Sequence, residues 1–151
     1  MFERITCLKR DMSEKEFIIS IVGAFIGTLL ASFFSNMILT AEDMPLILAS
    51  TGASAILIFA LPFSPVSQPW NLVGGHLVSA FVGVSCYFLV PDELLAASLS
   101  IFFAMFFMHY LCCMHPPGGA TAITAVVGGA NVHAMGYAFI IIPVFINSII
   151  L

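Results

Sequence analysis

The chain has 151 residues, of which 61% are hydrophobic and 8% charged, with a formal net charge of −4. A soluble domain carries roughly 25% charged residues, so this chain could not cover its surface in water, and the composition indicates an integral membrane protein. All four basic residues lie within the first fifteen positions, and no charged side chain follows Glu93. Nucleic-acid binding is excluded because the sequence offers no basic patch.

Six apolar segments predict an all-α fold, a polytopic transmembrane helical bundle. The segments are 17–39, 44–61, 76–90, 94–114, 121–128 and 134–151. The first and fourth are long enough to cross about 30 Å of hydrocarbon, whereas the pattern leaves open whether the fifth crosses or re-enters. Pro116-Pro117 must break the chain after the fourth segment, and Pro143 is expected to kink the sixth.

The charges predict the orientation of the bundle. Residues 1–16 are expected to form a cytoplasmic lead-in to a signal-anchor helix, and residues 17–151 the transmembrane domain. The positive-inside rule then places the N-terminus in the cytoplasm of a cell (inner) membrane. The basic residues are Arg4, Lys9, Arg10 and Lys15. Alternation puts the acidic loops at 42–43 and 92–93 outside, and the 62–75 loop inside with the 115–117 break.

A short motif occurs twice. Gly52-Ala53-Ser54-Ala55-Ile56 returns 67 positions later as Gly119-Ala120-Thr121-Ala122-Ile123. This predicts two related halves of three segments each, with a short or discontinuous helix at each pentad. Halves with an odd number of crossings would be inverted, which we favour, whereas re-entrant pentad segments would make them parallel.

The pentads are candidate binding elements. If each pentad begins a helix, its unpartnered N–H groups and the helix dipole can bind an anion without Lys or Arg. The hydroxyls of Ser54 and Thr121 add donors. The alternative is that small residues only allow tight helix packing. Packing is the favoured interpretation of two further stripes at four-residue spacing, which are Gly23, Gly27, Ala31 and Ser35, and Gly75, Ser79 and Gly83.

The most specific local motif is His115-Pro116-Pro117-Gly118-Gly119. An unwound segment at membrane depth must be buried in protein or line a water-filled cavity, which favours a place on a solute pathway over a plain helix break. Any proton coupling would fall to histidine, since no carboxylate lies inside a span. The four histidines are His76, His109, His115 and His133.

A rival set of residues lies on the fourth segment. Met105, Met108, His109 and Cys112 recur at helical spacing, and thioether, thiol and imidazole ligands on one face would suit Cu(I). Methionine and cysteine are also ordinary apolar side chains in a membrane helix, and this second interpretation is favoured.

The chain resembles the HPP family of small integral membrane proteins. The resemblance rests on 114–122, which contains the HPP motif, on Gly52–Ala55 with Pro62-x-Ser64-Pro65, and on Gln68-Pro69-x-Asn71-x-x-Gly74-Gly75-His76. It implies a compact helical membrane domain, usually described with four spanning helices, and a link to nitrite transport through some plant chloroplast and cyanobacterial members. A basic residue often follows Gln-Pro in this family, whereas Trp70 stands there in this chain.

We therefore expect a membrane transporter or channel for a small anion, nitrite in particular, with no enzymatic activity, no cofactor and no bound metal. A homo-oligomer, taken to be a dimer, is expected in the bilayer. The candidate pathway residues are Gly52, Ala53, Ser54, Gln68, Asn71, His76, His115, Pro116, Pro117, Gly118, Gly119, Ala120 and Thr121. The alternatives are a Cu(I)-handling membrane protein and a scaffold or sensor subunit that transports nothing.

Overall fold

A computed structural model describes residues 12–39, 41 and 43–151, and all regular structure in that part of the chain is helical. The long helices are α2 (Glu14–Asn36), α3 (Met44–Ala60), α4 (Pro69–Leu89), α5 (Glu93–Tyr110) and α6 (Gly118–Val127). The shorter elements are η1 (Pro65–Ser67), α7 (Ala130–Met135), the π-helical segment η2 (Ile140–Phe145) and α8 (Ile146–Ile150). Arg4, Lys9, Arg10 and Glu42 lie outside the described residues.

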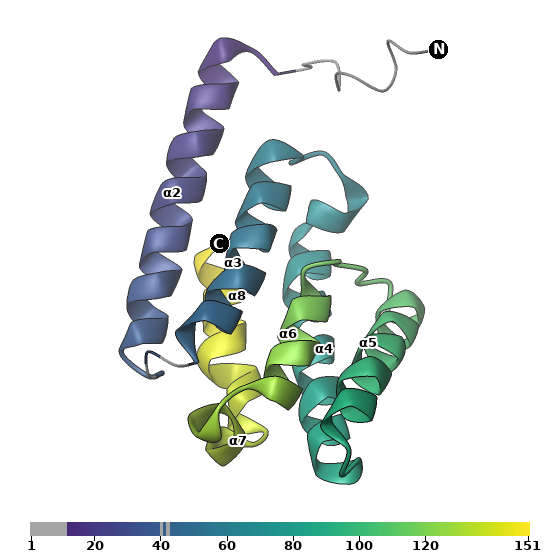
Figure 1. Ribbon diagram of the computed structural model, residues 1–151. Helices are drawn as coiled ribbons and strands as arrows, with labels where there is room; N and C mark the ends of the chain where they lie inside the picture. The colour runs from purple at the N-terminus through teal and green to yellow at the C-terminus, as the bar shows by residue number, and fades with distance from the viewer. Residues whose placement is uncertain (1–11, 40, 42) are drawn as a thin grey trace, which may run out of the picture.

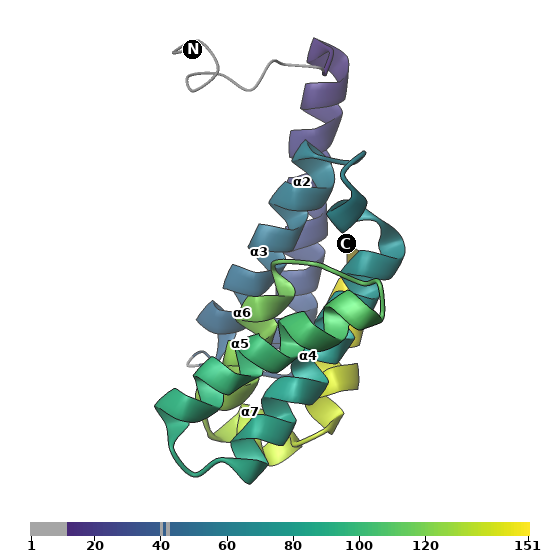
Figure 2. The same cartoon turned by 90° about the vertical axis from the view of Figure 1, so that its right-hand side faces the viewer.

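The helices form one bundle with α6 at its centre. α6 packs against α3, α4 and α5, while α2 lies at one edge against α3 and α8 (Figure 1). The view from the side shows α5 at the front of the bundle (Figure 2). The pentad helices α3 and α6, far apart in sequence, are therefore neighbours in space.

Among the described residues, three helices are long and apolar enough to cross a membrane, namely α2, α4 and α5. α6 has 10 residues and spans only about 15 Å, half the thickness of the hydrocarbon layer. The fifth segment is thus a half-length helix preceded by an unwound stretch, residues 111–117, that folds back into the bundle.

The running directions of the helices support the inverted arrangement. Successive long helices alternate in direction, so α2–α3–α4 runs down–up–down while α5, α6 and the C-terminal segment run up–down–up (Figure 1). The end of α2, the start of α3 and the turn from α4 to α5 lie at one end of the bundle, and η1 and the 111–117 segment lie at the other. The acidic loops and the proline-rich loops are therefore on opposite sides, as the charge pattern predicted.

Small residues allow α4 to pack closely against α6 and against the 111–117 segment. A Cβ atom added at Gly83 would collide with the Ala122 carbonyl oxygen and lie 2.8 Å from Ala125 Cβ. One added at Gly75 would lie 2.5 Å from His115 Cβ and 2.9 Å from the Cys113 carbonyl oxygen. Glycine is required here because backbone rather than a flexible side chain occupies the space. The packing interpretation of this stripe is confirmed.

The stripe on α2 packs in the same manner. Gly27, Ala31 and Ser35 are buried, and a Cβ at Gly23 would lie 2.5 Å from Phe59 of α3. The opposite face of α2 exposes large apolar side chains such as Ile19, which is 70% exposed. A face of this kind is stable against lipid tails and not against water. At its N-terminus α2 has a capping box between Ser13 and Glu16.

Two expectations about helix ends need correction. The first pentad does not begin a helix, because Gly52 lies in the middle of α3, where Pro45 and not the pentad occupies the first turn. Only the second pentad lies at a helix start, in α6. The sixth segment is broken more strongly than one kink would break it, since Ile142 before Pro143 is non-helical and α7, η2 and α8 are separate elements.

The packing of α4 on α6 predicts that Gly83→Ala destabilises the protein, since the new methyl group meets backbone that cannot move aside. We expect a loss of about 1–3 kcal/mol in the free energy of unfolding. Gly52→Ala is the matched control, because nothing lies within 4 Å of the position of its Cβ. Thermal unfolding in detergent, followed by circular dichroism, measures both. Equal melting temperatures for the two variants would contradict the packing argument.

Candidate functional site

Five buried polar side chains form one hydrogen-bonded chain through the core, here called the hydroxyl–imidazole chain. Its members in order are Ser50, Thr121, His76, Ser54 and His115. The successive distances are 2.7 Å from Ser50 Oγ to Thr121 Oγ1, 2.8 Å on to His76 Nδ1, 2.8 Å from His76 Nε2 to Ser54 Oγ, and 3.0 Å on to His115 Nε2. Each member is at most 5% exposed.

The two pentads meet at His76. Ser54 and Thr121 hold the third position of their pentads, and each places its hydroxyl on one of the two ring nitrogens of His76. The sequence repeat therefore becomes a spatial pair around one imidazole on α4. The link between the halves is made by side chains and not by two helix N-termini.

Local sequence explains the remaining positions of the chain. Ser50 and Ser54 are four residues apart, so they share one face of α3. His115 enters the core where Pro116-Pro117 separates α5 from α6, and its ring packs edge-on against His76 with centroids 4.9 Å apart. His115 Nδ1 lies 2.8 Å from the Val66 carbonyl oxygen, which ties the break to η1.

The N-terminus of α6 differs from the expected anion site. The N–H groups of Gly118, Gly119 and Ala120 donate to the carbonyl oxygens of residues 115, 116 and 117 at 2.9–3.1 Å. These groups are therefore partnered within the turn and are not free for a solute. Gly119 also faces α5, since its Cβ position lies 3.3 Å from Ile101 Cδ1. In the first pentad Gly52 and Ala53 lie on the outer side of α3, where Ala53 is exposed.

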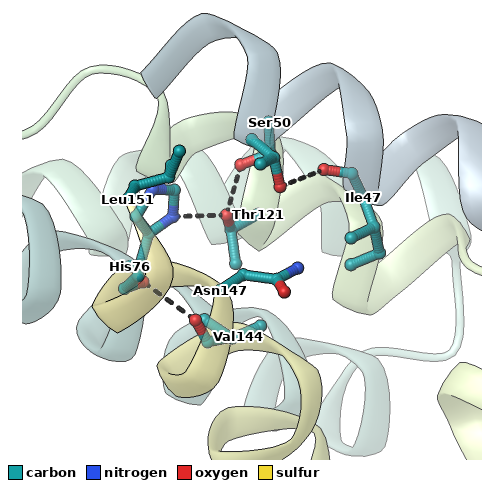
Figure 3. A pocket seen from close by; sticks show the side chains of 9 residues that line it. Ile47, Ser50, His76, Thr121, Val144, Asn147 and Leu151 are labelled. Atoms are coloured by element: carbon teal, nitrogen blue, oxygen red, sulfur yellow. Dashed lines mark hydrogen bonds between the residues drawn. The ribbon is translucent and has the colours of Figure 1, made fainter. Parts of the chain in front are cut away.

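A small cavity lined by both polar and apolar side chains borders the hydroxyl–imidazole chain. Figure 3 shows Ser50, His76 and Asn147 gathered around Thr121. The cavity has a volume of about 20 Å³, which is room for about one water molecule. Its lining residues are Ile47, Ser50, Thr51, His76, Thr121, Val144, Asn147, Ser148 and Leu151.

Asn147 supplies an unsatisfied acceptor at this cavity. Its side chain is 94% buried and its amide nitrogen donates to Ser35 Oγ at 2.8 Å, but its Oδ1 has no hydrogen-bond partner. A buried carbonyl oxygen left unpaired costs about 1–3 kcal/mol, so a hydrogen-bond donor beside Oδ1 would stabilise it. A larger hollow of about 380 Å³ is lined by apolar side chains alone, namely Leu77, Val78, Phe81, Val82, Phe107, Leu111 and Ile140.

Gln68 and Asn71 lie away from the cavity and brace the loops around it. Gln68 Nε2 donates to the carbonyl oxygens of Pro62 and Ser64, and Asn71 Nδ2 donates to that of Met114 at 2.9 Å. Trp70 donates from its indole to the Leu111 carbonyl oxygen at 3.1 Å. The contacts of Trp70 and Asn71 fix the 111–117 segment and so position His115.

The other two histidines are outside the hydroxyl–imidazole chain. His133 stacks on Tyr87 with centroids 3.8 Å apart and bonds to the Val126 carbonyl oxygen. His133 therefore does not lie between two pentad hydroxyls, as His76 does. His109 is on the exposed side of α5.

Sequence reasoning missed Ser50 and Asn147. Ser50 lies one helical turn before Ser54, and this spacing could have identified it. Asn147 is an amide within an otherwise apolar run, and such a residue in a membrane segment signals a function by itself.

The copper alternative gains no support from the geometry. Met108 is buried and in contact with Ser79, whereas Met105 is 60% exposed and Cys112 is also exposed, so the residues do not share one face. Within the described part of the chain no group of three His, Cys, Asp or Glu side chains is arranged to hold a metal ion.

Replacing Met105, Met108 and Cys112 together by leucine is expected to leave the protein folded and its transport intact. Leucine keeps the bulk of the apolar side chains and supplies no metal ligand. Melting temperature and solute flux in liposomes measure the outcome. Loss of flux in a triple variant that folds well would favour a metal site on α5.

Comparison with known proteins agrees with the architecture. The family described as "HPP, transmembrane region" matches residues 9–151. Two transmembrane proteins of Dictyostelium discoideum are 36% and 31% identical to the chain over 132 and 134 residues, which is 85% and 86% of this chain and 42% and 47% of theirs. The chain thus spans less than half the length of these curated relatives, and no solved structure matches it. With the histidine of its HPP motif at one end of the buried chain of hydrogen bonds, the protein belongs to the HPP family of transmembrane proteins.

Proposed function

We propose that the protein is the membrane domain of a transporter or channel for a small anion, with nitrite as the leading candidate. The observation that carries the proposal is the set of buried hydroxyl, imidazole and amide groups around one cavity, in a bundle whose other buried contacts are largely apolar. Polar groups inside a membrane are costly to maintain, and they mark solute or ion pathways by default.

The chemistry of the lining favours an anion over a cation. No carboxylate is among the lining residues, so a cation would lack a negative partner. Hydroxyl groups and an imidazole N–H can donate hydrogen bonds to an anion. The amide of Asn147 could donate from its nitrogen if its two ends exchanged, because Ser35 Oγ can also act as a donor. Nitrite in particular comes from the family resemblance.

A solute larger than water needs the cavity to widen. The cavity of about 20 Å³ lies between α3, α4 and α6 on one side and η2 and α8 on the other. The C-terminal segment is interrupted at Ile142 and Pro143, so it is the wall best suited to move. We propose that its displacement opens the cavity to one side of the membrane, and that the N-terminus lies in the cytoplasm as the basic residues 4–15 favour.

Purified protein in liposomes provides the direct test. We expect nitrite uptake above that of protein-free liposomes, measured at alkaline pH where nitrite stays ionised and does not leak across as its acid. Nitrate and chloride in parallel measure selectivity. Equal uptake of all three anions with and without protein would overturn the proposal and leave the scaffold or sensor alternative.

Thr121→Val tests the lining. The variant keeps the side-chain shape and removes the hydroxyl that bonds both Ser50 and His76. We expect a loss of about five- to tenfold in apparent affinity for the anion, the equivalent of one hydrogen bond of about 1 kcal/mol.

Thr124→Val is the matched control. Thr124 is buried on the same helix, and its hydroxyl bonds only the Ala120 carbonyl oxygen of its own turn. The control should transport like the unchanged protein. Equal losses in both variants, in step with their melting temperatures, would show that these hydroxyls serve packing alone.

A further inference from the structure

The five-membered hydroxyl–imidazole chain has a property that anion binding alone does not require: when both histidines are neutral, only one placement of its protons makes all four side-chain contacts hydrogen bonds. His115 Nδ1 faces the carbonyl oxygen of Val66, so this nitrogen must carry a proton and donate it. A neutral His115 therefore has a bare Nε2, which must accept from Ser54 Oγ.

The rest of the neutral arrangement follows from Ser54. A hydroxyl has one proton, so a Ser54 that donates to His115 must accept from His76 Nε2–H. His76 Nδ1 is then bare and accepts from Thr121, which in turn accepts from Ser50. Every donor points toward His115, and no ring nitrogen of the two histidines is left without a partner.

One additional proton reverses every bond. If a hydronium ion in the cavity gives a proton to Ser50 and becomes water, the proton of Ser50 passes to Thr121, and that of Thr121 to His76 Nδ1. His76 releases its Nε2 proton to Ser54, and Ser54 gives its own to His115 Nε2. The balance is one proton gained from the cavity and one positive charge gained at His115. Ser50 then donates to the Pro117 carbonyl oxygen, which already lies 3.2 Å from its Oγ.

We propose that the hydroxyl–imidazole chain is a proton relay that carries a proton from the cavity to His115. Each transfer crosses a heavy-atom distance of 2.7–3.0 Å, so no side chain has to move. The two bonds that compete for the serine protons, from Ser54 to the Ser50 carbonyl oxygen and from Ser50 to that of Pro117, are longer at 3.1 and 3.2 Å.

The surroundings leave His115 as the acceptor of that proton. α4 presents His76 to it, while α3, α6 and η1 contain no titratable side chain. The preceding segment adds Cys113, whose side chain packs against Gly74. Asp43 is a buried carboxylate, but it bonds Gly129 and Asn131 and does not line the cavity. The inference depends on the proposed function in one respect only, which is the identity of the solute that would move with the proton.

The test reads the tautomer of each histidine directly. Nitrogen NMR of ¹⁵N-histidine-labelled protein in lipid bilayers distinguishes Nδ1–H, Nε2–H and doubly protonated rings. At alkaline pH we expect Nδ1–H on His115 and Nε2–H on His76. On acidification His115 should become doubly protonated while His76 changes to Nδ1–H in the same transition. His76→Gln and His115→Gln assign the signals.

Ser54→Ala removes the link between the two rings. In this variant His76 should no longer change tautomer when His115 gains its proton. Ser98→Ala is the control, because this exposed hydroxyl bonds only the Leu94 carbonyl oxygen on α5; it should keep the joint transition.

The relay would be overturned by a His76 tautomer that stays constant in the unchanged protein, or by a joint transition that survives Ser54→Ala. If that variant fails to fold, the tautomers of the unchanged protein alone decide between a relay and a static network. Absence of anion flux in liposomes would overturn the proposed function and would leave the tautomer result standing, so the two proposals fail separately.

Discussion

The imidazole of His76 lies between two hydroxyls that come from opposite halves of the chain, and the arrangement of the core depends on this contact. A buried imidazole in an apolar bundle is tolerated only when both ring nitrogens are bonded. Ser54 satisfies one nitrogen and Thr121 the other. Their helices, α3 and α6, must therefore stay in register with each other and with α4.

Close helix packing makes that contact possible. Gly75 and Gly83 remove the side chains that would keep the 111–117 segment and α6 away from α4. The break at Pro116-Pro117 then brings His115 into the core, and Trp70 and Asn71 anchor the broken segment through its carbonyl oxygens. Residues of the HPP motif and of the Gln-Pro-x-Asn stretch at the start of α4 thus together hold an unwound segment inside a membrane domain with its polar groups satisfied.

The same requirement, that buried polar groups have hydrogen-bond partners, also points to the candidate functional site. The described part of the bundle bonds its buried hydroxyls and histidines almost completely. Asn147 Oδ1 is the exception among these residues, and Asn147 lines the cavity. The polar pathway is therefore expected where α8 meets α3, α4 and α6, and not at the helix N-termini.

The sequence by itself indicated a membrane protein with six apolar segments and singled out Ser54, His76, His115 and Thr121 as candidates, while it left the choice between inverted and parallel halves open. Composition and hydropathy carry such information because the length of an apolar run and the charges beside it, which are both local features of the sequence, decide whether and how a segment crosses the hydrocarbon layer. The sequence did not determine the partners of these residues. Both pentads looked like helix starts, yet α3 begins eight residues before Gly52, and Ser50 and Asn147 joined the site from positions that no motif marked. Which hydroxyl meets which ring nitrogen depends on how α3, α4, α6 and the 111–117 segment pack, and only the tertiary structure decided this because those contacts join residues as far apart as 61 positions in the chain.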